Sequence, residues 1–90
     1  MRLSPTTETA LARYHDRHRG RLRIVPRHAA DLPGPQAIRL FMELLEAGEQ
    51  IDGAEVQAWF RDQGWPEADA RRLGELADGV AAELREQGRI

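Results

Sequence analysis

The chain has 90 residues and no cysteine, so its length suits one domain and its composition excludes disulfides, thiolate zinc sites and cysteine catalysis. No apolar run approaches the roughly 18 residues that a membrane helix needs, and residues 1–9 lack the apolar stretch of a secretory signal. These features predict a single soluble, cytoplasmic domain.

The charges divide the chain into two parts. Residues 1–28 contain seven arginines and two acids, a balance of +5, whereas residues 29–90 contain six arginines and thirteen acids, a balance of −7. We therefore expect a basic N-terminal arm, residues 1–28, followed by an acidic helical core domain, residues 29–90. Every basic residue is arginine, and lysine and asparagine, whose codons are AT-rich, are absent, which indicates a GC-rich, bacterial genome.

The first predicted helix covers residues 5–18. Ser4 can cap it and Pro5 suits its first position, while Gly20 is the predicted stop. Its apolar face is limited to Ala10, Leu11 and Tyr14. We therefore expect a weak helix that frays, because little packing would hold it.

Residues 21–27, RLRIVPR, alternate charged and apolar side chains, which predicts a short extended segment. Pro26 cannot donate to a β-ladder, so this basic connector is an edge strand or a coil that packs along the helices. Because the sequence offers no second strand, two copies of the chain could pair through this edge. The predicted partner-binding residues are Arg21, Leu22, Arg23, Ile24 and Val25.

A central helix is predicted over residues 35–47, with its stop at Gly48. Apolar side chains occupy roughly 220° of its helical wheel, whereas a surface helix needs only about 100°. We therefore expect neighbouring elements to cover this helix from two sides.

The next predicted helix, residues 53–63, has the clearest boundary signals. Asp52 is placed to cap its start, and Gly64 suits the left-handed position of a Schellman motif in which Trp65 contacts Phe60. Its inner face is predicted to consist of Val56, Trp59 and Phe60. The aromatic side chains here could form an exposed binding hot spot, although the inner-face position and the cap favour the core.

Pro66 begins the last predicted helix, residues 66–87, which stops at Gly88 and carries an apolar stripe about 140° wide. Gly74 and Gly79 each cost about 1 kcal/mol in an exposed helix interior, so we expect one or both to allow close approach of a neighbouring helix or a tryptophan.

The predicted fold is all-α, with a small three-helix unit preceded by the weak N-terminal helix and the extended basic connector. The predicted core residues are Ile38, Phe41, Leu44, Leu45, Val56, Phe60, Leu73, Leu76, Val80 and Leu84.

His15 and His18 lie three residues apart on one helical face and could chelate a divalent ion, with His28 completing the set. Neighbouring arginines would repel a cation, so we favour histidines that are solvated or stacked on Tyr14. No metal or other cofactor is predicted.

Two features could contact nucleic acid. Residues 53–84 have the helix, glycine turn, helix order of a helix-turn-helix, but Glu67 and Asp69 would oppose phosphates at the second helix, so core packing is favoured. The arm could instead neutralise phosphates without reading a groove, through Arg13, Tyr14, Arg17, Arg19, Arg21, Arg23 and Arg27. Otherwise it lies against its own acidic body or docks on an acidic protein.

No group of residues supports catalysis, since there is no glycine-rich phosphate loop and the only serine, Ser4, lies at a helix cap. We therefore predict that the chain is not an enzyme. The preferred function is a non-enzymatic helical protein–protein interaction module, a small adaptor or regulator whose partner is another protein or itself as a homodimer. The alternative is weak, sequence-tolerant nucleic-acid binding through the basic arm.

The segments IDGAEVQAWFRDQGW and PEADARRLGELADGV follow a helix that ends at Gly48. In this order of features, which covers about residues 37–80, the chain resembles small all-helical bacterial proteins grouped in families of unknown function. The resemblance implies a compact helical bundle and supplies no active-site residues. The arginine-rich arm has no counterpart in it.

Overall fold

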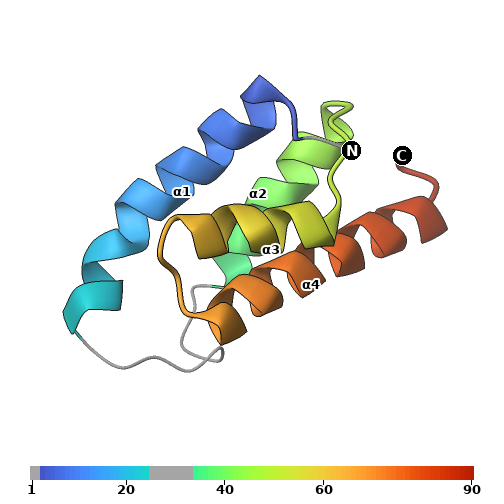
Figure 1. Ribbon diagram of the computed structural model, residues 1–90. Coiled ribbons are helices and arrows are strands. Elements are labelled where there is room, and N and C mark those ends of the chain that lie inside the picture. The colour runs from blue at the N-terminus through green and yellow to red at the C-terminus, as the bar shows by residue number, and fades with distance from the viewer. Residues whose placement is uncertain (1–2, 25–33) are drawn as a thin grey trace.

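Four helices make up the part of the chain that this computed structural model describes, which is residues 3–24 and 34–90 (Figure 1). Side chains are described for residues 3–17 and 36–90. The helices are α1 (Pro5–Ile24), α2 (Gly34–Glu46), α3 (Gly53–Asp62) and α4 (Glu67–Glu86). These ranges contain no strand, so the all-α prediction is confirmed, and the last three helices begin and end within one residue of their predicted limits. None of the described helices is long and apolar enough to cross a membrane.

α1 is longer than its sequence predicted. It continues past Gly20 to Ile24, so residues 21–24 are helical and the prediction of an extended segment was wrong for them. Residues 25–27 lie outside the described part of the chain. Arginine and leucine favour helices and one glycine costs only about 1 kcal/mol, so a short alternating pattern did not stop the helix. The backbone N–H groups of residues 21–24 are therefore used within α1, which removes the basis for strand pairing between two copies.

Side-chain caps fix where α1 and α3 begin. The Ser4 Oγ accepts a hydrogen bond from the Thr7 N–H at 3.1 Å, and the Asp52 carboxylate accepts one from the Ala54 N–H at 2.9 Å. Each bond satisfies one of the N–H groups that the first turn of a helix leaves without an intrahelical partner. Both predicted N-caps are confirmed.

Glycines in the left-handed conformation follow the ends of α2, α3 and α4, at Gly48, Gly64 and Gly88. After α3, the Trp65 N–H donates to the Phe60 carbonyl at 3.1 Å. Of the two hydrogen bonds of a Schellman motif, this is the one that spans more residues along the chain. The two ring centroids lie 4.9 Å apart. The predicted closure of this corner is therefore confirmed, and it sets the direction in which α4 leaves α3.

α3 and α4 pack with their backbones in contact at Gly53 and Gly74. A Cβ atom added to either glycine would overlap the carbonyl oxygen of the other. The Asp78 Oδ1 accepts a hydrogen bond from the Gly53 N–H at 2.8 Å, so a residue of α4 caps the first turn of α3. The predicted close approach is confirmed at Gly74, whereas Gly79 faces open space.

The core lies where α2, α3 and α4 meet, and it extends to α1. The predicted core residues that are buried are Phe41, Leu44, Leu45, Val56, Phe60, Leu73 and Leu84. Leu76 and Val80 are half-buried at its edge. Ile38 is 36% exposed, so its prediction as a core residue was wrong. α1 and α4 do pack against α2 from two sides, as predicted, but their cover stops short of Ile38.

α1 is packed more firmly than its thin apolar face predicted. Its buried stripe, at helical spacing and at most 4% exposed, consists of Thr7, Leu11 and Tyr14. The Tyr14 ring centroid lies 5.8 Å from that of Phe60 and 5.9 Å from that of Trp65. The large aromatic surface of Tyr14 therefore compensates for the small number of apolar side chains on α1.

Glu49, in the turn between α2 and α3, holds the start of α1. Its carboxylate accepts hydrogen bonds from the hydroxyls of Ser4 and Thr7, the latter at 3.1 Å. Because its hydroxyl is hydrogen-bonded, Thr7 can be fully buried although it is polar. A pattern of apolar residues alone does not reveal such a contact.

Candidate functional site

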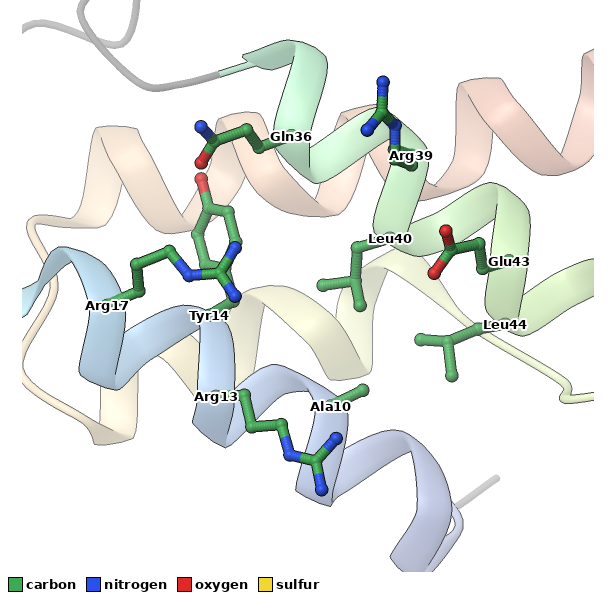
Figure 2. A pocket seen from close by; sticks show the side chains of 9 residues that line it. All are labelled: Ala10, Arg13, Tyr14, Arg17, Gln36, Arg39, Leu40, Glu43 and Leu44. Carbon is green, nitrogen blue, oxygen red and sulfur yellow. The ribbon is translucent and has the colours of Figure 1, made fainter.

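A groove of about 700 Å³ runs between α1 and α2 (Figure 2). Its floor consists of the less exposed side chains Ala10, Tyr14, Leu40 and Leu44. Its rim consists of the exposed side chains Arg13, Arg17, Gln36, Arg39 and Glu43. We call this feature the basic groove.

The α1 wall of the basic groove carries two arginines. Arg13 and Arg17 lie four residues apart, so they project from the same side of the helix, and both are exposed. Tyr14 lies between them in sequence but is only 4% exposed, because its ring packs against α3. By fixing the rotation of α1 about its axis, the buried Tyr14 keeps both arginines at the rim.

The α2 wall has an exposed polar strip at helical spacing, formed by Gln36, Arg39 and Glu43. Below it, Leu40 and Leu44 point toward α1, where Ala10 lies opposite them (Figure 2). The small side chain of Ala10 leaves space between the two helices unfilled at this level, and the floor is aliphatic. The basic groove therefore combines a charged rim with an apolar floor.

The side chains of the basic groove do not neutralise its charge, since three guanidinium groups accompany one carboxylate. Arg89 and Glu46, neither of which lines the groove, form an ion pair, and none is described for the three rim arginines. A guanidinium group presents five N–H donors in a planar fork that fits a carboxylate or a phosphate. The geometry thus suits an anionic partner.

Most of the other predicted site residues lie where side chains are not described. Those with a helical backbone in α1 are Arg19, Arg21, Leu22, Arg23 and Ile24. Val25 and Arg27 lie outside the described residues altogether. Of the predicted nucleic-acid set, the structure places Arg13 and Arg17 together on one surface. Tyr14 is buried, so it offers no open ring face for a base to stack on.

His15, one of the candidate metal ligands, is hydrogen-bonded to a core residue. The Trp65 Nε1–H donates to its Nδ1 at 2.7 Å, which places the ring proton of a neutral His15 on Nε2. The side chains of His18 and His28 are not described, and no metal-holding group of three ligands occurs among the described side chains. His15 joins α1 to the corner between α3 and α4 rather than stacking on Tyr14.

The helix-turn-helix-like unit is built into the core. Asp69, expected to oppose phosphates at the start of α4, is fully buried, and Glu67 is exposed. Phe60 and Trp65 are buried and Trp59 is half-buried. The interpretation of these aromatic residues as core, and not as an exposed hot spot, is therefore confirmed for Phe60 and Trp65.

The α2 half of the basic groove was not predicted as a site. Arg39 and Glu43 belong to the narrow polar strip of the central helix, which reads as an ordinary solvent-facing strip. The signal that could have drawn attention to it is Leu40, an apolar residue next to that strip on the wheel that the core does not fully bury.

No protein-family model, curated protein or solved structure matches this chain.

Proposed function

We propose that this chain is a non-enzymatic interaction module that binds an acidic segment of a protein in the basic groove. The observation that carries the proposal is the set of three rim arginines without described ion pairs above an aliphatic floor. Charge on the rim would steer the partner and fix its orientation, and apolar contact with the floor would supply affinity.

Several features favour a protein partner over nucleic acid. The floor of Ala10, Leu40 and Leu44 suits the apolar side chains of a helix or a turn. Glu43 on the rim would repel phosphates, and Tyr14 is buried where a nucleic-acid site would use an exposed ring.

A non-enzymatic role is supported by how the hydroxyl groups at the start of α1 are used. Ser4 caps the helix and, with Thr7, holds Glu49. Neither hydroxyl has a described histidine or lysine beside it to act as a base. These contacts stabilise the packing of α1 and so maintain the groove.

Fluorescence anisotropy with a labelled helical peptide tests the proposal. The peptide carries leucine at every third or fourth position and glutamate elsewhere, and its control has the same composition in scrambled order. We expect the patterned peptide to bind more tightly, and Arg17→Glu or Arg39→Glu to weaken binding at least about tenfold.

The matched control is Arg61→Glu, which makes the same charge change at an exposed position of α3 outside the groove. It should leave peptide binding within about twofold of the parent chain. If all three reversals weaken binding equally, or if the scrambled peptide binds as well, the groove is not the site. Tighter binding of a labelled DNA duplex or single strand, lost on Arg17→Glu, would favour the nucleic-acid alternative instead.

A further inference from the structure

The outer face of α4 carries an acidic patch. In the helical segment of residues 75–86 the acids on this outer face are Glu75, Glu83 and Glu86, against a single arginine, Arg85, whereas the Asp78 carboxylate faces α3. Within the described part of the chain, Glu75, Glu83 and Glu86 form no ion pair. We call this surface the α4 acidic face.

Two small residues lie among these acids. Gly79 and Ala82 are exposed on the same side of α4, and a Cβ atom added to Gly79 would meet nothing within 4 Å. Glycine destabilises an exposed helix interior relative to alanine, and no contact with a described residue requires it here. Because both residues are small, they leave a low strip between the charged side chains, where another surface can approach the helix closely.

The α4 acidic face and the basic groove are complementary in charge and form. The face has three acids and one arginine, and the groove has three arginines and one glutamate. Both are elongated along helices, and residues 75–86 rise about 17 Å along the axis of α4. In Figure 1, α2 and α3 lie between α1 and α4, so the groove of one molecule cannot reach its own α4 acidic face.

We propose that the acidic segment bound in the basic groove is the α4 acidic face of a second copy of this chain, an inference that rests on the proposed function. The contact joins two different surfaces, so each molecule can offer its α4 while its own groove takes the α4 of another. Such heterologous contacts lead to a ring or to an open chain, and not to a two-fold dimer.

Sedimentation velocity on the full chain gives the first test. The average mass should rise above the 10.2 kDa of one chain as the concentration increases through the micromolar range. It should fall again when salt is raised from about 0.1 M to about 1 M, because the Debye length shrinks from about 10 Å to about 3 Å. A single-chain mass throughout would overturn the inference.

Two charge-reversed variants give the decisive test. The groove variant carries Arg17→Glu with Arg39→Glu, and the face variant carries Glu75→Arg with Glu86→Arg. Each should sediment as a single chain, but an equimolar mixture should form a complex of two chains, because one intact groove meets one intact face. The control Asp62→Arg with Glu67→Arg reverses exposed acids outside the face and should assemble like the parent chain. Circular dichroism establishes that each variant is folded.

The results separate this inference from the proposed function. If the mixture shows no complex, or if assembly survives in either variant, the second copy is not the partner in the groove. Binding of the patterned peptide to the face variant, whose groove is intact, would then still support the proposed function. If the parent chain neither binds the patterned peptide nor assembles, both this inference and the proposed function are overturned.

Discussion

Helices α4 and α1 are attached to the rest of the molecule in different ways. α4 meets α3 backbone to backbone at Gly53 and Gly74, and its Asp78 caps the first turn of α3. No side chain separates the two helices at this point. The contact therefore requires that neither glycine carries a side chain, and it leaves the two backbones almost no room to shift toward each other.

α1 is held by side chains that reach across a wider space. Leu11 and Tyr14 fill the core, Thr7 bonds to Glu49, and His15 accepts a hydrogen bond from Trp65. Each attachment rests on its own side chain and can be removed by a separate substitution. The wider spacing that admits the basic groove beside α1 therefore also makes that helix the more easily detached part.

Phe41→Ala should have the largest effect on stability. Phe41 is fully buried in α2, at the centre of the unit that α3 and α4 complete. Removing its ring leaves a cavity, and we expect a loss of roughly 3–5 kcal/mol in the free energy of unfolding, measured by chemical denaturation. A loss below about 1 kcal/mol would contradict the placement of α2 in the core.

Gly74→Ala should be almost as damaging, at about 3 kcal/mol, although it adds a single methyl group. That group would overlap the carbonyl oxygen of Gly53, so α3 and α4 must separate. Gly79→Ala is the matched control in the same helix and should raise stability by about 0.5–1 kcal/mol, since Gly79 faces open space. Equal effects of the two substitutions would show that α3 and α4 do not approach so closely.

Leu11→Ala should loosen α1 selectively. Leu11 is fully buried, and we expect a loss of about 2 kcal/mol, the low end for this substitution, because α1 can shift toward the core. Amide hydrogen exchange should show faster exchange in α1 and little change in α3 and α4. Uniformly faster exchange in all helices would mean that α1 is as firmly integrated as the others.

Trp65→Phe should have the smallest effect, about 1 kcal/mol beyond the change in ring size, because it removes the hydrogen bond to His15 and keeps an aromatic ring at the corner. Trp59→Phe is the control, since its indole N–H makes no hydrogen bond with a described residue. Thermal unfolding measures both variants. A Trp59→Phe effect as large as that of Trp65→Phe would leave the hydrogen bond without a role in stability.

Local chemistry explains which parts of the fold were predictable. Asp52 and Gly64 each act within a few residues of their own position, so the sequence alone located the ends of α3. Gly20 resembled Gly64 but lacked a following apolar residue placed to close a Schellman motif, and the helix continued through it. A glycine is a reliable stop only together with the residues that complete the cap.

The candidate site was predictable only in part, because it depends on two helices that are distant in sequence. Arg13 and Arg17 stood out as members of an arginine-rich arm. Arg39 did not, since only the packing of α1 beside α2 brings it to the same groove. The exposure of Ile38 has a similar origin: the helical wheel gives the width of an apolar arc but not how far the neighbouring helices extend over it.

The contacts of α1 also determine when this helix can take its place as the chain is made. The hydrogen bond between Thr7 and Glu49 joins residues 42 positions apart in the sequence, and that between His15 and Trp65 joins residues 50 apart. The bond from Gly53 to Asp78 spans only 25 residues. Contacts between distant residues form more slowly, so pulse labelling of amides during refolding should protect α3 and α4 before α1. During synthesis α1 therefore emerges first and docks last, and a nascent chain has no basic groove until the corner at Trp65 has formed.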